Sequence, residues 1–475
     1  MSPDPDKDVE AVAVHSPSGP LYYRVKIGPF RLPYFASPIV QLLYVAVVFF
    51  LCPGLYNALS GLGGGGQLDA TVANNATVAL YSTFATTAFF SGTVCNKLGV
   101  RITLTLGCLG YSLYIASFLC YNHTKSAAFV ITAGALLGMS AAVIWAAQTV
   151  IMISYPKESQ KGKYIAIFWA IFNVGAVIGS LIPLAQTVNS EESGAVGDAT
   201  YSAFLALTAL GAIMAMFICN ASKVVRTDGS TITLMQHPTW RSELLGLWET
   251  LRTDWYITAL FPMFFASNWF YTYQFNDVNL ARFDTRTRSL NSLLYWCSQI
   301  FGALAWGAFL DMPHLKRKTR ARAGLLALFV ITMGLWGGGY AFQRTYDRQS
   351  APQQQLDWTS KGYAGPVILY ICYGLFDAIW QTYIYWTLGA ISNDSRKLAI
   401  LAGFYKSLQS AGAAIVYRID ALKVPYMNIF ASTWGLLAVG LVFAAPVVWT
   451  KIENHSEPHD ESEGKGGVTA DGTAS

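Results

Sequence analysis

The chain has 475 residues, of which 53% are hydrophobic and only 12% are charged, and its formal net charge is +5. A soluble domain carries roughly 25% charged residues, so this composition excludes an ordinary soluble protein. Helices that face lipid need no polar side, and we therefore expect the lipid bilayer to be the solvent of this chain. The small and scattered positive charge excludes a nucleic-acid-binding surface.

The first half of the chain is predicted to cross the membrane six times. Residues 1–36 are polar, begin with an acidic stretch that lacks the apolar core of a signal peptide, and are expected to form a cytosolic tail. A spanning helix needs roughly 20 mostly apolar residues. The segment 37–220 contains six such stretches, which are the predicted spans 37–60, 75–95, 100–121, 127–154, 162–186 and 200–220.

The second half repeats this pattern after a polar segment. Residues 221–255 form a cytosolic linker, and their stretch WRSELLGLWETL is predicted either as an amphipathic helix on the inner membrane surface or as a solvated linker helix. Residues 451–475 contain little to bury and are expected to be a disordered cytosolic tail. The segment 256–450 holds the six remaining predicted spans, at 256–275, 290–310, 323–342, 363–391, 398–417 and 427–450.

The placement of lysine and arginine predicts the orientation of these spans. With both termini in the cytosol, the cytosolic segments hold 22 of the 32 basic residues. Nearly all of the bias comes from the first half, although the loop 316–322 of the second half is also strongly basic. We therefore expect a multi-pass protein of the plasma membrane or an endomembrane with both termini in the cytosol.

Residue matches at fixed offsets relate the two halves. At an offset of 215, Phe49 and Phe50 correspond to Phe264 and Phe265, and at an offset of 236 Gly138 corresponds to Gly374. Each match is weak alone because membrane helices use few residue types, but each register covers two spans and the loop between them. The sequence therefore predicts an all-α membrane protein with twelve transmembrane helices in two pseudo-symmetric halves.

A short motif follows the second predicted span. It runs from Gly92 through Asn96, Lys97 and Gly99 to Arg101, and it resembles the G-x-L-x-D-R-x-G-R loop motif of the major facilitator superfamily. In that superfamily the glycines let two helices approach and the charged residues hold a cytosolic gate together. Asn96 replaces the usual acid, so it can cap a helix but cannot form the charge pair. A weaker copy of the motif follows the eighth predicted span and ends at Asp311. The alternative interpretation of both motifs is a sharp turn with basic residues and no gate role.

Three longer strings narrow the resemblance. Residues 57–66 (NALSGLGGGG) end the first predicted span, residues 271–276 (YTYQFN) end the seventh, and residues 283–291 (FDTRTRSLN) open the eighth. Together they are similar to fungal members of the uncoordinated-ninety-three-like family of ion-channel regulatory proteins, a branch of the major facilitator superfamily. The resemblance covers about residues 32–450 and implies a facilitator fold of two six-helix halves. It leaves the role open, because named animal members regulate channels or their traffic and fungal relatives are mostly regarded as transporters.

Two local patterns have simple interpretations. The glycine run 61–66 lacks the preceding strand and following Lys-Ser/Thr of a phosphate loop, so we interpret it as a flexible helix end. Asn75 and Asn122 lie in N-x-T sequences in predicted outer loops and are candidate glycosylation sites.

Two ionisable residues, Asp377 and Lys406, fall inside predicted spans, where a charged group usually faces a cavity or a partner. Trp380 and Gln381 share the helix face of Asp377, and Gln409 lies one turn after Lys406. At ~1.5 Å per residue the two ionisable groups differ in depth by roughly 9 Å, so a direct pair would need the long lysine arm. Other polar candidates, which could instead only join helices by hydrogen bonds, are Asn57, Trp145, Gln148, Asn173, Asn268, Gln274 and Gln299.

These features favour a secondary transporter that moves a small organic or ionic solute by rocking its halves about a midplane site. Asp377 would carry a coupling proton or bind a cationic group, and Lys406 would be its counter-ion or an anion contact. The alternative is a non-transporting regulator or trafficking partner of a channel or receptor, which Asn96 and the lack of arginine in the fourth span favour. No enzyme, cofactor or metal site is expected, because no nucleophile–base or ligand set falls in the spans.

Overall fold

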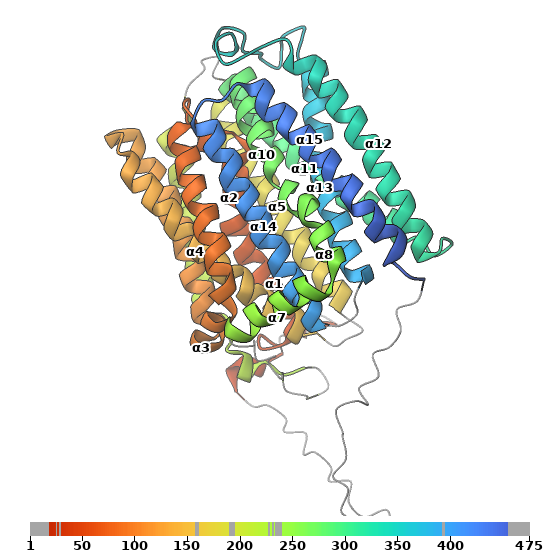
Figure 1. Ribbon diagram of the computed structural model, residues 1–475. Coiled ribbons are helices and arrows are strands. Elements are labelled where there is room, and N and C mark those ends of the chain that lie inside the picture. Colours follow the sequence, from red (N-terminus) through yellow and green to blue (C-terminus); the bar gives the residue numbers. More distant parts are fainter. Residues whose placement is uncertain are drawn as a thin grey trace, which may run out of the picture.

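A computed structural model describes residues 19–24, 26–27, 30–156, 161–189, 195–226, 229, 232, 240–391 and 395–454. Long, roughly parallel helices form a single bundle (Figure 1). The described chain begins and finishes toward the same end of this bundle, which we call the terminal end. The opposite end, called the distal end, carries the loops 62–70, 281–284, 344–363 and 422–425.

In the N-terminal half four of the six predicted spans are separate helical stretches, and the other two are merged in one long helix. The elements of this half are α1 (Pro38–Phe49), the π-helical turn η2 (Phe50–Gly54), α2 (Leu55–Gly61), α3 (Thr71–Thr124), α4 (Ala127–Ser154), α5 (Lys161–Thr187) and α6 (Asp198–Met216). The 54-residue α3 is interrupted at Gly99, whose φ of 76° is outside the helical range. Gly99 therefore separates the two stretches that the sequence predicts as the second and third spans.

The C-terminal half has five continuous helices and one broken one. The continuous helices are α11 (Thr285–Leu310), α12 (Arg317–Gln343), α13 (Ala364–Ile391), α14 (Ser395–Ala421) and α15 (Tyr426–Thr450). The predicted seventh span is divided into α8 (Trp255–Ala259), α9 (Phe261–Ala266), α10 (Trp269–Thr272) and the π-helical turn η6 (Tyr273–Leu280). Pro262 lies in the first turn of α9, and Asn268 before α10 has a non-helical φ of −123°.

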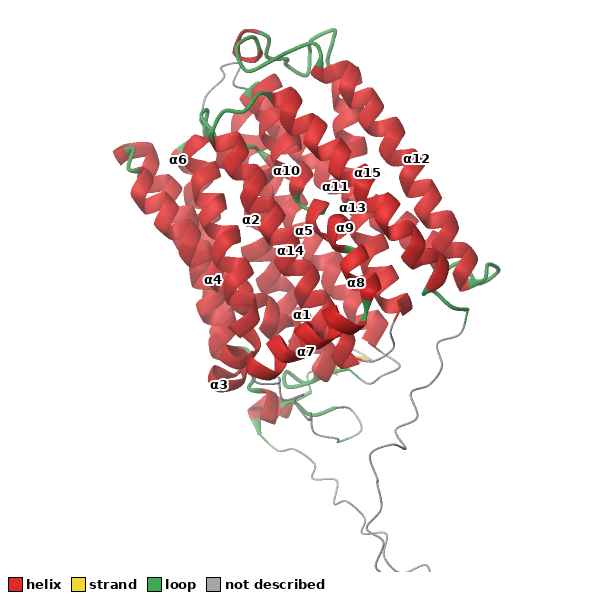
Figure 2. Cartoon of the chain, in the orientation of Figure 1, coloured by secondary structure: helices red, strands yellow, loops and turns green. Residues whose placement is uncertain are grey.

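Short elements occupy the ends of the bundle (Figure 2). At the distal end these are η3 (Gly64–Gly66) and η7 (Ala351–Gln353); toward the terminal end they are η1 (Pro20–Tyr22), the antiparallel strands β1 (Lys26–Ile27) and β2 (Phe30–Arg31), η5 (Ala221–Lys223) and α7 (Trp240–Thr253). Helix α7 lies across the terminal end, contacts both α3 and α14, and exposes Leu245 and Trp248. This placement agrees with the amphipathic helix predicted in the linker.

Nine helical stretches of the described chain are long and apolar enough to cross a membrane. Because α3 holds two of the predicted spans, these stretches account for ten of the twelve expected helices. The broken segment α8–η6 and α14 fall outside this set. The helical, multi-pass fold is therefore confirmed, while the count of twelve spans depends on these two polar segments.

Each half has its own apolar core. One cluster of buried side chains comes from residues 34–232 and a second comes almost entirely from residues 256–452. Ala176 of α5 belongs to the second cluster, and Tyr81 of α3 packs against both. The halves are thus separately packed bodies that meet along α3, α5, α11 and α14.

Two close helix contacts show the internal symmetry directly. A side chain at Gly138 of α4 would come within 2.0 Å of the Leu80 carbonyl oxygen on α3. A side chain at Gly374 of α13 would likewise come within 2.5 Å of the Tyr295 carbonyl oxygen on α11. Leu80 and Tyr295 differ by the offset of 215, and the glycines by the offset of 236, that the sequence comparison uses. Equivalent helices therefore cross at equivalent glycines in the two halves.

The orientation of the bundle can be tested by labelling single cysteines. We expect the terminal end to be cytosolic, so Lys318→Cys should stay unlabelled by a membrane-impermeant thiol reagent on intact cells that carry the protein at their surface. Lys361→Cys, at an exposed position of the distal end, should react. The unsubstituted protein measures labelling of the native cysteines. Reaction at position 318 with none at 361 would reverse the predicted topology.

Candidate functional site

The Asp377 carboxylate lies at the middle of α13 and is fully buried. Its Oδ2 accepts hydrogen bonds from the hydroxyls of Tyr271 at 2.9 Å and Tyr295 at 3.1 Å, and from the amide of Gln299. Its Oδ1 accepts from Gln381 Nε2 at 2.7 Å. Four neutral donors from α10, α11 and α13 thus compensate for the loss of water around this carboxylate.

A chain of amides connects this carboxylate to α14. Gln409 Nε2 donates to Asn268 Oδ1 at 2.7 Å and to Gln381 Oε1 at 3.4 Å. Lys406 Nζ in turn donates to Gln409 Oε1 at 2.9 Å. Lys406 is therefore linked to Asp377 through two glutamines, and the described structure contains no direct ion pair between them. We call Asp377, its four donors, Gln409, Asn268 and Lys406 the central network.

Two aromatic rings flank the ammonium group of Lys406. Tyr385 and Tyr405 have ring centroids 5.6 and 5.4 Å from Nζ, within the range of a cation–π interaction. Gln274, predicted among the polar candidates, accepts from Tyr295 at 2.8 Å and extends the network toward η6. The sequence thus identified most members of the network, although Tyr271 and Tyr295 were missed as donors because tyrosines are abundant in this chain.

Trp380 does not line the same space as Asp377, contrary to expectation. Its side chain is fully buried, packs against Phe376 and donates from Nε1 to Ser267 at 3.0 Å. A residue three positions along a helix is displaced by about 60° from its partner. That difference turns Trp380 into the core of the C-terminal half, while Gln381 stays beside the carboxylate.

The candidate residues of the N-terminal half contribute a different surface. Asn57 on α2 and Asn173 on α5 are half-buried at interior positions, and no hydrogen bond to either side chain occurs in the described part of the structure. Trp145 stacks on Trp169 with ring centroids 5.9 Å apart and belongs to an aromatic cluster. Gln148 is buried and accepts only from its neighbour Thr149. None of these side chains bonds to the central network.

The predicted gate motif lies at the terminal end. Gly92 is buried, Gly99 breaks α3, and Asn96 and Lys97 are exposed. Asp311 ends α11, is exposed and forms no ion pair among the described residues. The gate role of this motif therefore stays a prediction.

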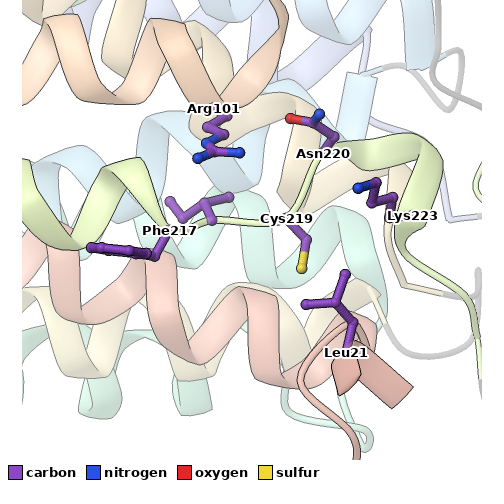
Figure 3. A pocket seen from close by; sticks show the side chains of 7 residues that line it. Leu21, Arg101, Phe217, Cys219, Asn220 and Lys223 are labelled. Carbon is purple, nitrogen blue, oxygen red and sulfur yellow. The ribbon is translucent and has the colours of Figure 1, made fainter. Parts of the chain in front are cut away.

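Arg101 of this motif lines a small pocket of about 250 Å³ within the N-terminal half (Figure 3). The other residues around the pocket come from the chain start, the end of α6 and the following turn: Leu21, Phe217, Ile218, Cys219, Asn220 and Lys223. Arg101 thus faces residues of its own half in this pocket, and Asp311 is not among the residues that line it.

The distal end contains a polar cluster that the sequence did not predict. Asp420 Oδ2 accepts from the amides of Asn74 at 2.6 Å and Asn276 at 2.9 Å, and Asn276 also donates to Asn74 Oδ1 at 2.7 Å. Arg348 forms a salt bridge with Asp420 Oδ1, and its Nη2 lies 3.9 Å from Asp277 Oδ1. We call Asn74, Asn276, Asp277, Arg348 and Asp420 the distal latch, because Asn74 on α3 joins the N-terminal half to the others.

A buried arginine strengthens this closure. Arg288 on α11 is 2% exposed and donates to the carbonyl oxygens of Leu62 at 2.9 Å, Gly63 at 3.0 Å and Gln67 at 3.4 Å. Gly64 N donates to Asn276 Oδ1 at 2.8 Å. The three strings that carry the family resemblance therefore meet at this interface, although they are far apart in the chain.

The glycine run 61–66 is consequently an ordered part of this interface, not a flexible helix end. Gly63 has a φ of 75°, and a side chain there would come within 2.1 Å of the Phe275 carbonyl oxygen. Only glycine fits that backbone conformation and that close approach. The sequence pattern signalled unusual backbone geometry correctly, but the partner that requires it is 212 residues away from Gly63.

The candidate glycosylation sites lie on α3 and not in loops. Asn75 is in its second turn and accepts a hydrogen bond from Arg418 at 3.0 Å. Asn122 is in its last turn, where its Nδ2 donates to Asp198 at 2.8 Å and its Oδ1 accepts from Gln67. Both are at the distal end, the predicted outer side, and their modification stays a prediction.

Two separately packed helical halves with polar networks at mid-depth and between them define a facilitator-type membrane transporter fold. A family model described as Major Facilitator Superfamily matches residues 34–417, and the chain therefore belongs to that superfamily. An UNC93-like protein of Schizosaccharomyces pombe is 51% identical over 96% of this chain and 91% of its own length. UNC93-like protein 1 of Arabidopsis thaliana is 41% identical over 91% of this chain and 94% of its own length. Within the superfamily, the chain is a member of the UNC93-like proteins.

Solved structures of distant relatives confirm the fold. The chain is similar to a D-xylose-proton symporter with a TM-score of 0.60 and 11% identity, covering 88% of this chain and 99% of the symporter. It is also similar to the fucose:proton symporter of Escherichia coli, with a TM-score of 0.56 and 13% identity over 86% of this chain and 98% of that one. At these identities the likeness establishes architecture alone.

Proposed function

We propose that this protein is a secondary transporter that moves a small organic or ionic solute by alternating access, with Asp377 as the coupling group. The observation that carries the proposal is the central network itself. It places one fully buried carboxylate at mid-depth, surrounded by neutral donors and connected through amides to one lysine. An ionisable group at this depth is energetically costly, and such groups usually belong to a functional site.

The chemistry of the network suits a group that exchanges protons. Tyr271, Tyr295, Gln299 and Gln381 stabilise an ionised carboxylate by donating to it, and their oxygens can accept from a protonated one. Among the described residues no cation forms an ion pair with Asp377, so proton binding does not require such a salt bridge to break. Lys406, held between two tyrosine rings, supplies a positive charge for an anionic solute group or for the ionised carboxylate.

The half-buried amides of the N-terminal half provide the other side of a midplane site. The side chains of Asn57 and Asn173 form no hydrogen bond with any residue that the structure describes, and Trp145 offers an aromatic face. Small solutes with hydroxyl, amide or ring groups could bind between these residues and the central network. The D-xylose-proton and fucose:proton symporters share this fold, and the fold is therefore compatible with the proton coupling proposed here.

The test is solute flux in vesicles that contain only this protein, measured across a panel of small organic and ionic solutes with an imposed pH gradient. Wild type should take up at least one solute in response to the gradient. Asp377→Asn should abolish gradient-driven uptake, because the amide cannot exchange the proton, while solute exchange without a gradient should persist. Glu453→Gln, which removes an exposed carboxylate, is the matched control and should behave as wild type.

A regulatory role without transport is the second candidate. It is favoured by the charge-free α4 and by Asn96 in place of the acid of the gate motif. A regulator predicts no flux for any solute in wild type and a membrane protein that co-purifies with it. Flux that is equal in wild type and Asp377→Asn would support transport but remove Asp377 from the coupling step.

A further inference from the structure

The distal latch contains more negative than positive charge. Asp277 and Asp420 are 0% and 2% exposed, and Arg348 is the cation that contacts them. Asp420 has a complete set of partners, since it accepts from Arg348, Asn74 and Asn276. The guanidinium of Arg348 therefore lies near two buried carboxylates but forms a hydrogen bond with Asp420 alone.

The carboxylate of Asp277 has no hydrogen-bond donor among the described residues. In the described part of the chain both carboxylate oxygens are buried without a hydrogen-bond partner, and the 3.9 Å from Oδ1 to Arg348 Nη2 is too long for a hydrogen bond. Other contacts hold Arg348 in its position, because its Nε donates to the Val424 carbonyl and its guanidinium lies 4.1 Å from the Tyr426 ring centroid. Burial without a hydrogen bond strongly disfavours an ionised carboxylate, so the neutral acid is the form that fits this environment.

The groups around Asp277 come from several elements. Asp420 lies in the last turn of α14, and Arg348 follows α12. Tyr273, Tyr346 and Tyr426 supply the neighbouring hydroxyl-bearing rings, and the Tyr346 hydroxyl donates to the Asp277 backbone carbonyl at 3.0 Å. Arg282 contacts Tyr346, with its Cζ 4.7 Å from the ring centroid, and donates a hydrogen bond to the Gln354 carbonyl oxygen. Arg348 and Asp420 thus remain the charged groups that face the Asp277 carboxylate.

The position of this pair connects its protonation to movement of the halves. Two hydrogen bonds connect the halves at this position. The Asn74 amide on α3 donates to Asp420, and the Gly64 N–H donates to Asn276, the residue next to Asp277. Separation of the halves at the distal end would remove these contacts and admit water to both carboxylates. Hydrated aspartates ionise near their ordinary range, so opening releases the proton that closure had bound.

We propose that Asp277 and Asp420 form a proton-binding site, and that closure of the distal end takes up one proton from the distal side. The site is separate from the central network and does not depend on which solute, if any, the protein carries. The unusual backbone of η6, a π-helical turn, positions Asp277 toward α14 and Arg348. Such turns occur frequently at functional sites of helices.

The experiment measures the distance between the halves and needs no solute. Spin labels at Ser126→Cys in the N-terminal half and Lys361→Cys in the C-terminal half, both exposed distal positions, report open and closed populations in the purified protein with its native cysteines replaced. For one proton taken up on closure, the closed-to-open ratio of wild type should fall about tenfold for each pH unit above its midpoint, scanned from about pH 5 to about pH 8.

Variants identify the group that titrates. Asp277→Asn is permanently neutral, so it should stay closed at alkaline pH and lose the pH dependence. Asp69→Asn is the matched control, because Asp69 also pairs across the halves at the distal end, with Lys423 at 2.7 Å, but its side chain is 70% exposed. An exposed pair contributes little, so this variant should keep the wild-type slope.

A second measurement on wild type avoids reliance on folded variants. The infrared band of a protonated carboxylic acid should be present in the closed state and should vanish as the distal end opens. Replacing sodium with N-methylglucamine at constant pH should leave the populations unchanged. A pH-independent distance distribution, an unaltered slope in Asp277→Asn, or populations that follow sodium would each overturn the proton site, and none of these outcomes bears on solute flux.

Discussion

Arg288→Met is expected to lower the stability of the folded protein and to open its distal end. The variant keeps a flexible, unbranched apolar side chain but removes the guanidinium, so the carbonyl oxygens of Leu62, Gly63 and Gln67 lose their donor. Buried acceptors left unsatisfied cost about 1–3 kcal/mol each, partly offset because a buried charge is also removed, so we expect a net loss of about 3 kcal/mol. The thermal midpoint in detergent should fall by about 5 °C or more.

Two further variants define the cause of this effect. Arg288→Lys keeps the charge but not the planar fork, and should fall between wild type and Arg288→Met. Arg344→Met removes an exposed arginine after α12 that covers the Tyr340 ring, and should change the stability by less than about 0.5 kcal/mol. The distance between the spin labels at positions 126 and 361 should lengthen in Arg288→Met but not in Arg344→Met. Equal midpoints for Arg288→Met and wild type would contradict the role of Arg288 in closure.

Asp377→Leu is expected to unfold the C-terminal half much more readily than Asp377→Asn. The leucine offers no acceptor to Tyr271, Tyr295, Gln299 and Gln381, whereas asparagine keeps one oxygen and can donate to the tyrosines. At about 1–3 kcal/mol for each buried donor left unpaired, the leucine variant should lose at least about 3 kcal/mol and the asparagine variant about 1 kcal/mol.

The comparison separates structure from function at one position. Thermal midpoints measured by loss of monodisperse protein on heating should rank wild type and Asp377→Asn close together and Asp377→Leu well below. Only the asparagine variant is then suited to the flux test, because its loss of proton-driven uptake cannot be attributed to unfolding. If leucine were tolerated as well as asparagine, the four hydrogen bonds would contribute little, and the network would lose its structural basis.

The latch and the central network occupy different depths in the same protein. The inter-half hydrogen bonds of Asn74, Arg288 and Gly64 lie at the distal end, whereas Asp377 lies at the middle of α13. A solute site at mid-depth with a closed distal end is an arrangement that alternating access requires in one of its states. Protonation at the latch would then favour that state, independently of the proton carried by Asp377.

Composition and the lengths of the apolar stretches determined the membrane class and the order of the predicted spans. These properties follow from residue type alone, because a spanning helix must be apolar over its length and must satisfy its own backbone. The offsets of 215 and 236 likewise identified the repeat that the contacts at Gly138 and Gly374 display. Asp377, Lys406, Gln381 and Gln409 could be singled out because a polar group in an apolar stretch is visible in the sequence itself.

Only the tertiary structure decided which polar groups meet. The turn of α13 directs Gln381 toward Asp377 but Trp380 into the core, and Lys406 reaches Asp377 only through glutamines. The distal latch joins residues that are up to 346 positions apart. These residues lie near the ends of their spans, where polar residues are common and therefore do not indicate a functional site. Long-range pairing of this kind depends on how α3, η6 and α14 pack, and side-chain spacing along one helix contains no information about a second helix.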